Sequence, residues 1–204
     1  MARLRGIFKV DFYYKRQTKH TISLLKVILL TFFVFSIDYI SISSASKYVG
    51  SESNIKAAFL YHFTKFVNWP ENTNDNNQLL VGVMASGEML EAIMALDGKK
   101  SLNKVIKIKK IDKICSEDKD FLKDIKIIFL QANFPCNRDE LIDFAIKNHI
   151  LTVSDEKDLI TEGIVISLYK VDTKIRFDIN LKIAQKSQLV ISSKLLRLAR
   201  RVVR

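Results

Sequence analysis

The chain has 204 residues, with 33 Lys and Arg against 22 Asp and Glu, and its formal net charge is +11. Seven of these cations and two of the carboxylates lie in residues 1–46, so residues 47–204 carry only +6. So mild an excess of positive charge gives no reason to expect nucleic-acid binding. The 158 residues that follow position 46 suit one domain, which can fold around its own core without a metal or a disulfide.

Residues 1–46 have the pattern of a secretory signal. Seven cations precede an apolar run at 27–37, and Ser44 and Ser46 are small residues at the positions that a signal peptidase reads. The run is shorter than the roughly 20 apolar residues of a membrane span, and Asp38 ends it. We therefore expect export and cleavage after Ser46; an uncleaved N-terminal anchor is the alternative.

The first expected element of residues 47–204 is an aromatic helix with the sequence IKAAFLYHFTKFVNWP, at 55–70. Ser53 or Asn54 can cap its start, and the Trp69–Pro70 pair ends it because proline pushes the preceding residue out of the α region. Trp69 could also be an exposed anchor for a partner. Six apolar side chains repeat at helical spacing and predict one face packed on a sheet: Ile55, Phe59, Leu60, Phe63, Phe66 and Val67.

Strands and helices then alternate along the chain. Apolar or alternating runs predict strands at 79–85, 105–111, 125–131 and 149–155, and helices are expected at 87–96, 137–148 and 156–163. Two strands at 164–169 and 174–180 form a hairpin around the turn 170–173. The sequence therefore predicts a single α/β domain, with a mixed, mostly parallel sheet flanked by helices and a late antiparallel hairpin.

Two segments of the C-terminal part are expected to expose one face to solvent. In the strand 174–180, Ile175, Phe177 and Ile179 alternate with charged residues, which predicts one covered face and one solvated face. The run 193–203 predicts a last helix with arginines on its outer side, capped by Ser192 or Ser193. Such a basic helix is usually a core helix with a solvated face, although contact with acidic lipid headgroups is the alternative.

Signals for catalysis or metal binding are weak. His62 lies at the boundary of the aromatic helix, and no histidine has the spacing of a metal motif. Four carboxylates cluster at the start of a short helix, where acidic residues favour the helix dipole: Asp155, Glu156, Asp158 and Glu162. We therefore expect no catalytic residue, no metal and no cofactor, and an exported hydrolase that uses His62 is the disfavoured alternative.

The chain contains two cysteines, Cys115 and Cys136. In the oxidising setting of an exported protein, such a pair is expected to form a disulfide. The alternative is that both are small apolar residues of the core.

Three blocks of the sequence resemble the YfiR family of periplasmic regulators: IKAAFLYHFTKFVNWP (55–70), ILTVSDEKDLITEGIVISLY (150–169) and KIRFDINLKIAQKSQLVISSKLLRLARRV (174–202). The resemblance implies a periplasmic, non-catalytic protein that binds and represses the periplasmic domain of an inner-membrane diguanylate cyclase. Such repression lowers cyclic di-GMP and restrains biofilm formation. The resemblance also implies a homodimer and redox-sensitive disulfides.

We expect the partner to bind an exposed surface around Leu159, Glu162 and Tyr169, together with Arg176 on the solvated face of the strand 174–180 and with Trp69. Peripheral contact with the membrane is a further expectation. An alternative function is that of a periplasmic small-molecule-binding sensor, because an α/β sheet has crevices at its strand ends.

Overall fold

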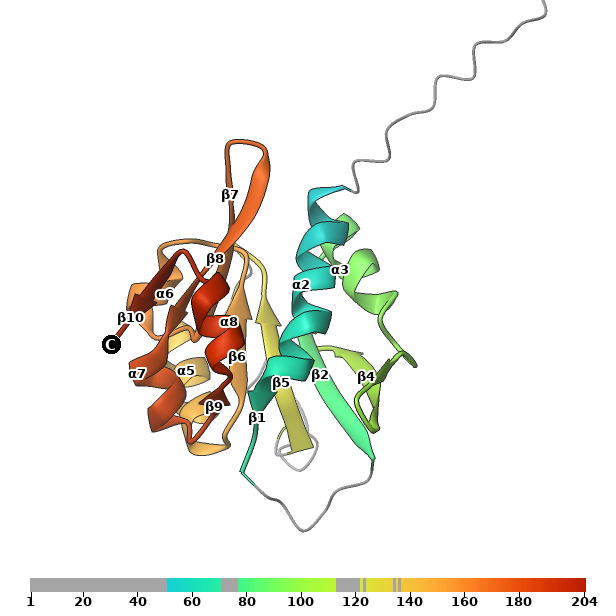
Figure 1. Ribbon diagram of the computed structural model, residues 1–204. Coiled ribbons are helices and arrows are strands. Elements are labelled where there is room, and N and C mark those ends of the chain that lie inside the picture. The colour runs from blue at the N-terminus through green and yellow to red at the C-terminus, as the bar shows by residue number, and fades with distance from the viewer. Residues whose placement is uncertain (1–50, 71–76, 113–121, 123, 134, 136) are drawn as a thin grey trace, which may run out of the picture. The chain divides into compact units, whose positions relative to one another are not determined.

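The computed structural model describes residues 51–70, 77–112, 122, 124–133, 135 and 137–204 (Figure 1). The expected signal segment 1–46 and both Cys115 and Cys136 lie outside these residues. Among the described residues, no helix is long and apolar enough to span a bilayer.

An eight-stranded sheet forms the centre of the described fold, in the order β10-β8-β7-β6-β5-β2-β4-β3. Neighbours from β7 to β4 run parallel, β8 pairs antiparallel with β7, β3 pairs antiparallel with β4, and β10 pairs parallel with β8. This arrangement confirms the predicted α/β class, the mostly parallel sheet and the late hairpin. The strands are β2 (Gln78–Met84), β3 (Lys100–Ser101), β4 (Lys104–Lys110), β5 (Ile125–Leu130), β6 (Leu151–Ser154), β7 (Ile166–Val171), β8 (Lys174–Asn180) and β10 (Arg201–Val203).

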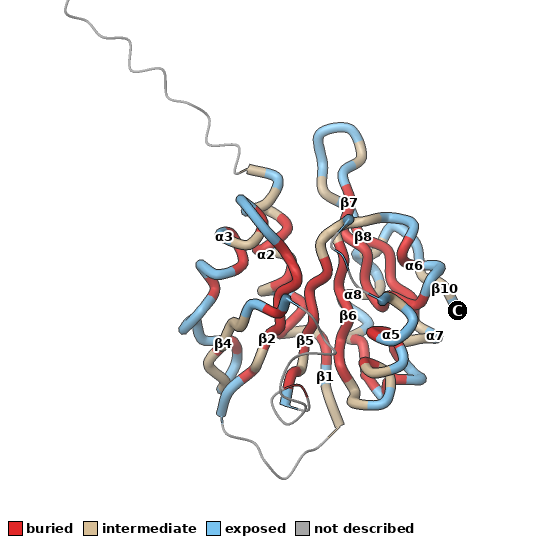
Figure 2. Tube along the Cα trace, turned by 180° about the vertical axis from the view of Figure 1, so that it is seen from behind, coloured by how far each residue is buried: buried red, intermediate tan, exposed pale blue. Residues whose placement is uncertain are grey.

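Helices cover both faces of the sheet, which is why most residues of the central strands are buried (Figure 2). On one face lie α2 (Glu52–Phe66), α3 (Gly87–Met94), α7 (Leu181–Lys186) and α8 (Ser193–Leu198), whose apolar side chains form the larger hydrophobic core. On the other face α5 (Arg138–Lys147) and α6 (Leu159–Glu162) enclose a smaller core. A separate pair of short strands, β1 (Val67–Asn68) and β9 (Val190–Ile191), joins the end of α2 to the segment before α8.

The aromatic helix α2 packs on the sheet as the sequence predicts. Phe63 is fully buried, and its ring centroid lies 5.4 Å from that of Phe177 on β8. The expected cap at Ser53 or Asn54 is wrong, because Ser51 accepts a hydrogen bond from the Asn54 backbone N–H and begins the helix earlier. The helix ends at Phe66, since the next two residues extend to pair with β9.

The predicted last helix over 193–203 is only half correct. Ser192 caps α8 as expected, but the helix stops at Leu198 and the chain extends through Ala199 into β10. There Arg201 lies opposite Asp178 in the register of β10 with β8. The helical propensity of this arginine- and leucine-rich run is therefore overridden by strand pairing and by the demand of a buried carboxylate for a cation.

The β7–β8 hairpin extends beyond the rest of the sheet, and its tip is exposed (Figures 1 and 2). Its turn is tighter than predicted, with only Asp172 and Thr173 between the strands, and Asp172 has a φ of 53° that aspartate tolerates. The expected solvated face of β8 ends at Arg176, because Asp178 is only 1% exposed.

Candidate functional site

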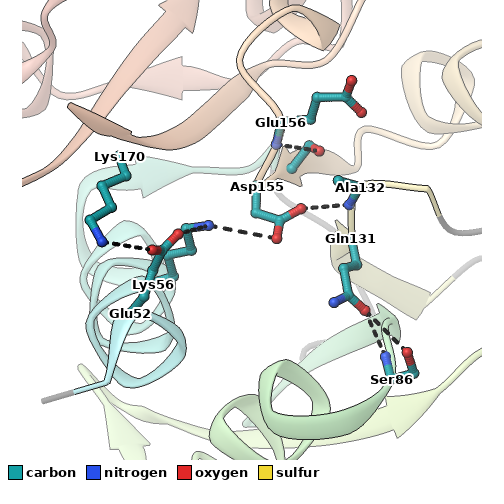
Figure 3. A network of polar contacts seen from close by, with 9 residues as sticks. Glu52, Lys56, Ser86, Gln131, Ala132, Asp155, Glu156 and Lys170 are labelled. Carbon is teal, nitrogen blue, oxygen red and sulfur yellow. Dashed lines mark hydrogen bonds and ion pairs between the residues drawn. The ribbon is translucent and has the colours of Figure 1, made fainter. Parts of the chain in front are cut away.

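Several elements meet at the edge of the sheet where the parallel strands end. The segments that follow β2, β5 and β6 lie there, together with the hairpin tip, because all these strands run in the same direction. The first turn of α2 lies at the same edge, where its side chains contact both the residue after β6 and the hairpin (Figure 3). We call this region the carboxyl edge.

A chain of charged contacts joins these elements. The ammonium of Lys56 lies 2.7 Å from Glu52 Oε1, one turn earlier in α2, and 3.6 Å from Asp155 Oδ2. The other carboxylate oxygen of Asp155 accepts a hydrogen bond from the backbone N–H of Ala132, after β5. Glu52 Oε2 in turn lies 3.6 Å from the ammonium of Lys170, near the hairpin tip. One network therefore fixes the start of α2 to two strand ends and to the hairpin.

Burial decides how much each contact in this network matters. Lys56 is only 5% exposed, so its charge depends on the two carboxylates for stabilisation. The side chain of Glu52 is 41% exposed, and water screens its interactions. The hydrogen bond from Lys56 lowers the pKa of the Glu52 carboxyl, and the charges of Lys56 and Lys170 add to this effect against partial burial.

The middle of the carboxyl edge contains a topological switch point. The chain leaves β2 toward α3 on one face and leaves β5 toward α5 on the other, although these strands are neighbours. Ligands of open α/β sheets bind at such points. Here the side-chain oxygen of Gln131 accepts a hydrogen bond from the backbone N–H of Ser86 at 2.8 Å, which joins the segments that follow β5 and β2 (Figure 3).

A second polar cluster lies between β7, β8 and β10. The Tyr169 hydroxyl donates to Asp178 Oδ1 at 2.7 Å, and Arg201 Nε donates to Asp178 Oδ2 at 3.0 Å. Burial raises the pKa of the Tyr169 hydroxyl, and the hydrogen bond to Asp178 adds to the rise. Lys157 and Arg200 lie over the tyrosine ring, at 5.6 and 6.0 Å from its centroid.

Of the five predicted partner-binding residues, two are exposed, two are buried and one is half-buried. The expectation that Leu159 and Tyr169 are exposed is wrong, since Leu159 packs in the smaller core and Tyr169 is only 7% exposed. Glu162 and Arg176 are exposed, and Glu162 lies 3.4 Å from Arg138. Trp69 is half-buried against the larger core, and its Nε1 donates to the carbonyl of Lys126 near the start of β5. Trp69 therefore lies at the opposite edge of the sheet from the hairpin tip.

The residues weighed for chemistry have structural contacts instead. His62 is exposed on the outer side of α2, beside the ring of Tyr61. In the carboxylate cluster, Asp155 binds Lys56, whereas Glu156 and Glu162 both lie within 4 Å of Arg138. No group of three side chains that could hold a metal occurs in the part of the chain that the structure describes.

Sequence reasoning missed Lys56, the central residue of the carboxyl-edge network. The spacing of Glu52 and Lys56, four residues apart, could have indicated an ion pair on one side of a helix. The burial of Lys56 and its contact with Asp155 had no sequence signal, because the two residues are far apart in the chain and meet only when α2 packs on the sheet.

Comparison with known proteins gives one informative match: the family model described as YfiR/HmsC-like matches residues 53–200. No curated protein sequence matches the chain. The chain is 11% identical to the ABC domain in complex with L-Trp from Streptococcus pneumonia, with a TM-score of 0.45 over 63% of this chain and 56% of that one. It is 12% identical to a protein described as an O-acetylhomoserine (thiol)-lyase from Campylobacter jejuni, with a TM-score of 0.37 over 57% of this chain and 29% of that one. Both TM-scores are too low to support a statement on function.

Proposed function

We propose, since this chain belongs to the YfiR/HmsC-like family of periplasmic diguanylate cyclase regulators, that it is an exported inhibitor without catalytic activity. It binds the periplasmic domain of an inner-membrane diguanylate cyclase and represses the enzyme. Repression lowers cyclic di-GMP and restrains biofilm formation. The observation that carries this proposal is the family match, which spans residues 53–200 and so includes both hydrophobic cores and the hairpin.

The surface that we assign to the cyclase contains Glu162 at the end of α6 and Arg176 on the hairpin. Both side chains are exposed, and α6 packs against β7 and β8. Tyr169 and Leu159 lie beneath this surface and support it, so they act on the partner only through the fold. Trp69, at the other edge of the sheet, is a separate candidate contact.

The first test measures intracellular cyclic di-GMP in the native host with and without the gene. We expect a rise on deletion, reversal on complementation, and no rise in a strain that also lacks the one membrane cyclase concerned. Unchanged cyclic di-GMP in the deletion strain, under both oxidising and reducing growth conditions, would contradict the proposed function.

The binding surface has its own test in the double variant Glu162→Ala/Arg176→Ala. Loss of two central contacts weakens an interface by about tenfold or more, and the variant should fold normally because both side chains are exposed. Glu91→Ala/Lys99→Ala, at two exposed residues on the far side of the sheet, also leaves the net charge unchanged and is the matched control. If both doubles bind the purified cyclase domain as tightly as the wild type, this surface is wrong although the function is not.

Two assembly features are part of the same proposal. We assign a homodimer to the chain from its family, and a disulfide between Cys115 and Cys136 from the oxidising compartment. Analytical ultracentrifugation of residues 47–204 tests the dimer. Mass spectrometry of peptides prepared without reductant tests the disulfide, and two separately alkylated cysteines would refute it.

The switch point between β2 and β5 favours a second candidate function, a small-molecule-binding sensor. A ligand there would have to displace the side chain of Gln131 from the backbone N–H of Ser86. Thermal-shift screening of residues 47–204 with metabolites tests this candidate, and Gln131→Ala should change the response to a true ligand.

A further inference from the structure

Charge is unevenly divided along the chain. Residues 170–204 contain ten Lys and Arg against two Asp, a net charge of +8, whereas residues 47–169 contain sixteen Lys and Arg against eighteen Asp and Glu, a net charge of −2. The weak overall excess of positive charge therefore conceals a strongly basic C-terminal segment of 35 residues. Such asymmetry between parts of one chain points to an anionic partner for the basic part.

The basic segment forms the last elements of the fold. Residues 170–204 form the hairpin tip, β8, α7, β9, α8 and the edge strand β10 (Figure 1). Strands β8 and β10 end the sheet on one side, and α7 and α8 pack on the face that α2 covers. All ten cations are exposed, while one of the two carboxylates, Asp178, is buried. We call the exposed cations of these elements the basic face; they are Lys170, Lys174, Arg176, Lys182, Lys186, Lys194, Arg197, Arg200, Arg201 and Arg204.

Most of these cations have no carboxylate partner among the residues that the structure describes. Lys170 pairs with Glu52 and Arg201 with Asp178, and Arg200 lies against the ring of Tyr169. Within the part of the chain that the structure describes, the other seven form no ion pair: Lys174, Arg176, Lys182, Lys186, Lys194, Arg197 and Arg204. The basic face therefore keeps its charge available for a partner.

Protection of the sheet edge explains only part of this pattern. Charged residues on an edge strand prevent pairing with other strands, which accounts for Arg201 and Arg204 on and after β10. It does not account for the cations of α7 and α8, because helices present no unpaired strand edge. An apolar side chain also lies among these cations, since Leu198, between Arg197 and Arg200 in sequence, is 67% exposed.

We propose that the basic face binds the anionic phospholipid headgroups of a bilayer surface. Cations spread over several elements, with unpaired and flexible side chains, suit a diffuse layer of phosphates better than a protein patch that demands fixed geometry. Exposed Leu198 can enter the boundary between headgroups and acyl chains, as apolar residues beside cations do in peripheral proteins. Binding at the bilayer keeps the protein close to membrane-embedded partners, but it requires none of them.

The test uses residues 47–204, which contain every residue of both hydrophobic cores, so that the apolar run 27–37 cannot contribute. Vesicles of phosphatidylethanolamine with phosphatidylglycerol are compared with vesicles of phosphatidylcholine in a co-sedimentation assay. We expect binding to the anionic vesicles alone, and loss of that binding in high salt, because the Debye length falls to about 3 Å at 1 M.

The decisive variant reverses three exposed cations, Lys194→Glu/Arg197→Glu/Arg204→Glu. Each cation near an anionic bilayer contributes about fivefold in affinity, so loss of three cations alone weakens binding on the order of one hundredfold, and the added carboxylates should weaken it further. The control Lys99→Glu/Lys100→Glu/Lys110→Glu makes the same change in net charge at the far side of the sheet and should lose no more than a few-fold. Circular dichroism and urea midpoints verify that both triples are folded.

Three results would overturn the proposal. The first is that the wild type does not bind anionic vesicles, and the second is that both triples lose affinity equally, which would mean that only net charge matters. The third is that the Lys194/Arg197/Arg204 triple binds vesicles normally but no longer represses the cyclase, which would identify an acidic protein surface as the occupant. The vesicle assay contains no cyclase, so its result is independent of the proposed function.

Discussion

Lys56 and Asp178 are both buried ionisable residues that join distant elements, but their surroundings differ. Lys56 is stabilised by two carboxylates, one of them on the partly solvated Glu52, and its network reaches the surface at Lys170. Asp178 is enclosed by a tyrosine hydroxyl and an arginine between three strands. The comparison suggests that the carboxyl edge responds to salt and to acidic pH, whereas the β7–β8–β10 cluster responds to alkaline pH through Tyr169.

The largest effect should come from Arg201→Met. This change leaves the carboxylate of Asp178 buried with only the hydroxyl of Tyr169, and an uncompensated buried charge costs about 3–5 kcal/mol. Urea denaturation at neutral pH measures the loss in free energy of unfolding. Arg204→Met, three residues later and exposed, is the control and should be nearly neutral. A loss below about 1 kcal/mol for Arg201→Met would mean that Asp178 is solvated.

Lys56→Met should have a smaller effect, of about 2–3 kcal/mol. The carboxylate of Asp155 loses its cation but keeps the hydrogen bond from the backbone N–H of Ala132. Lys65→Met on the same helix, where Lys65 lies over the ring of Tyr61, should cost much less and is the control. Equal losses for the two variants in urea denaturation would show that the burial of Lys56 has no energetic importance.

Tyr169→Phe tests the β7–β8–β10 cluster through its stability at alkaline pH. The variant loses one hydrogen bond to Asp178, which costs about 1 kcal/mol at pH 7. Because the pKa of Tyr169 is raised in the folded protein above its ordinary value of 10.0, the wild type loses stability as pH rises above 10. The difference between wild type and variant should therefore shrink above pH 10. A difference that stays constant to pH 11 would argue against this assignment.

Glu52→Gln should give the smallest effect, below about 1 kcal/mol, since Glu52 is partly solvated and Lys56 keeps Asp155 as a partner. The lowered pKa of the Glu52 carboxyl means that its contribution is present above the ordinary value of 4.5 and disappears as the pH falls through the folded-state pKa. Urea midpoints of wild type and variant should differ at pH 7 and converge near pH 3. High salt should reduce the difference at pH 7 as well.

Much of the fold could be predicted from local patterns. The apolar run at 125–131 has the length and the β-branched composition of a buried strand, and the hairpin strands alternate with the period of two that is typical of a sheet. The helix predicted over 193–203 is wrong beyond Leu198, because Leu, Arg and Ala favour a helix wherever tertiary packing does not decide the structure. Here packing does decide, since Arg201 is needed opposite Asp178. A charged residue in an alternating strand is normally predicted to face solvent, and nothing in the local sequence shows that Asp178 is buried.

The candidate site was less predictable than the fold. Glu162 and Arg176 are exposed as expected, because polar residues at a helix end and beside a hairpin turn normally face solvent. Leu159 on α6 and Tyr169 on β7 are buried instead, because large apolar and aromatic side chains tend to be covered in a folded protein. The links from Lys56 to Asp155 and from Glu52 to Lys170 join residues that are far apart in the chain, and only the assembled sheet brings them together.

The position of β10 has a consequence for the order in which the chain can fold. Asp178 precedes Arg201 by 23 residues, so β8 is available before the cation that neutralises its buried carboxylate. Until Arg201 arrives, burial of Asp178 against β7 is unfavourable and this flank of the sheet stays open. The edge strand therefore acts as a late closing step, and β8 becomes firmly seated only after the segment that follows it has been made.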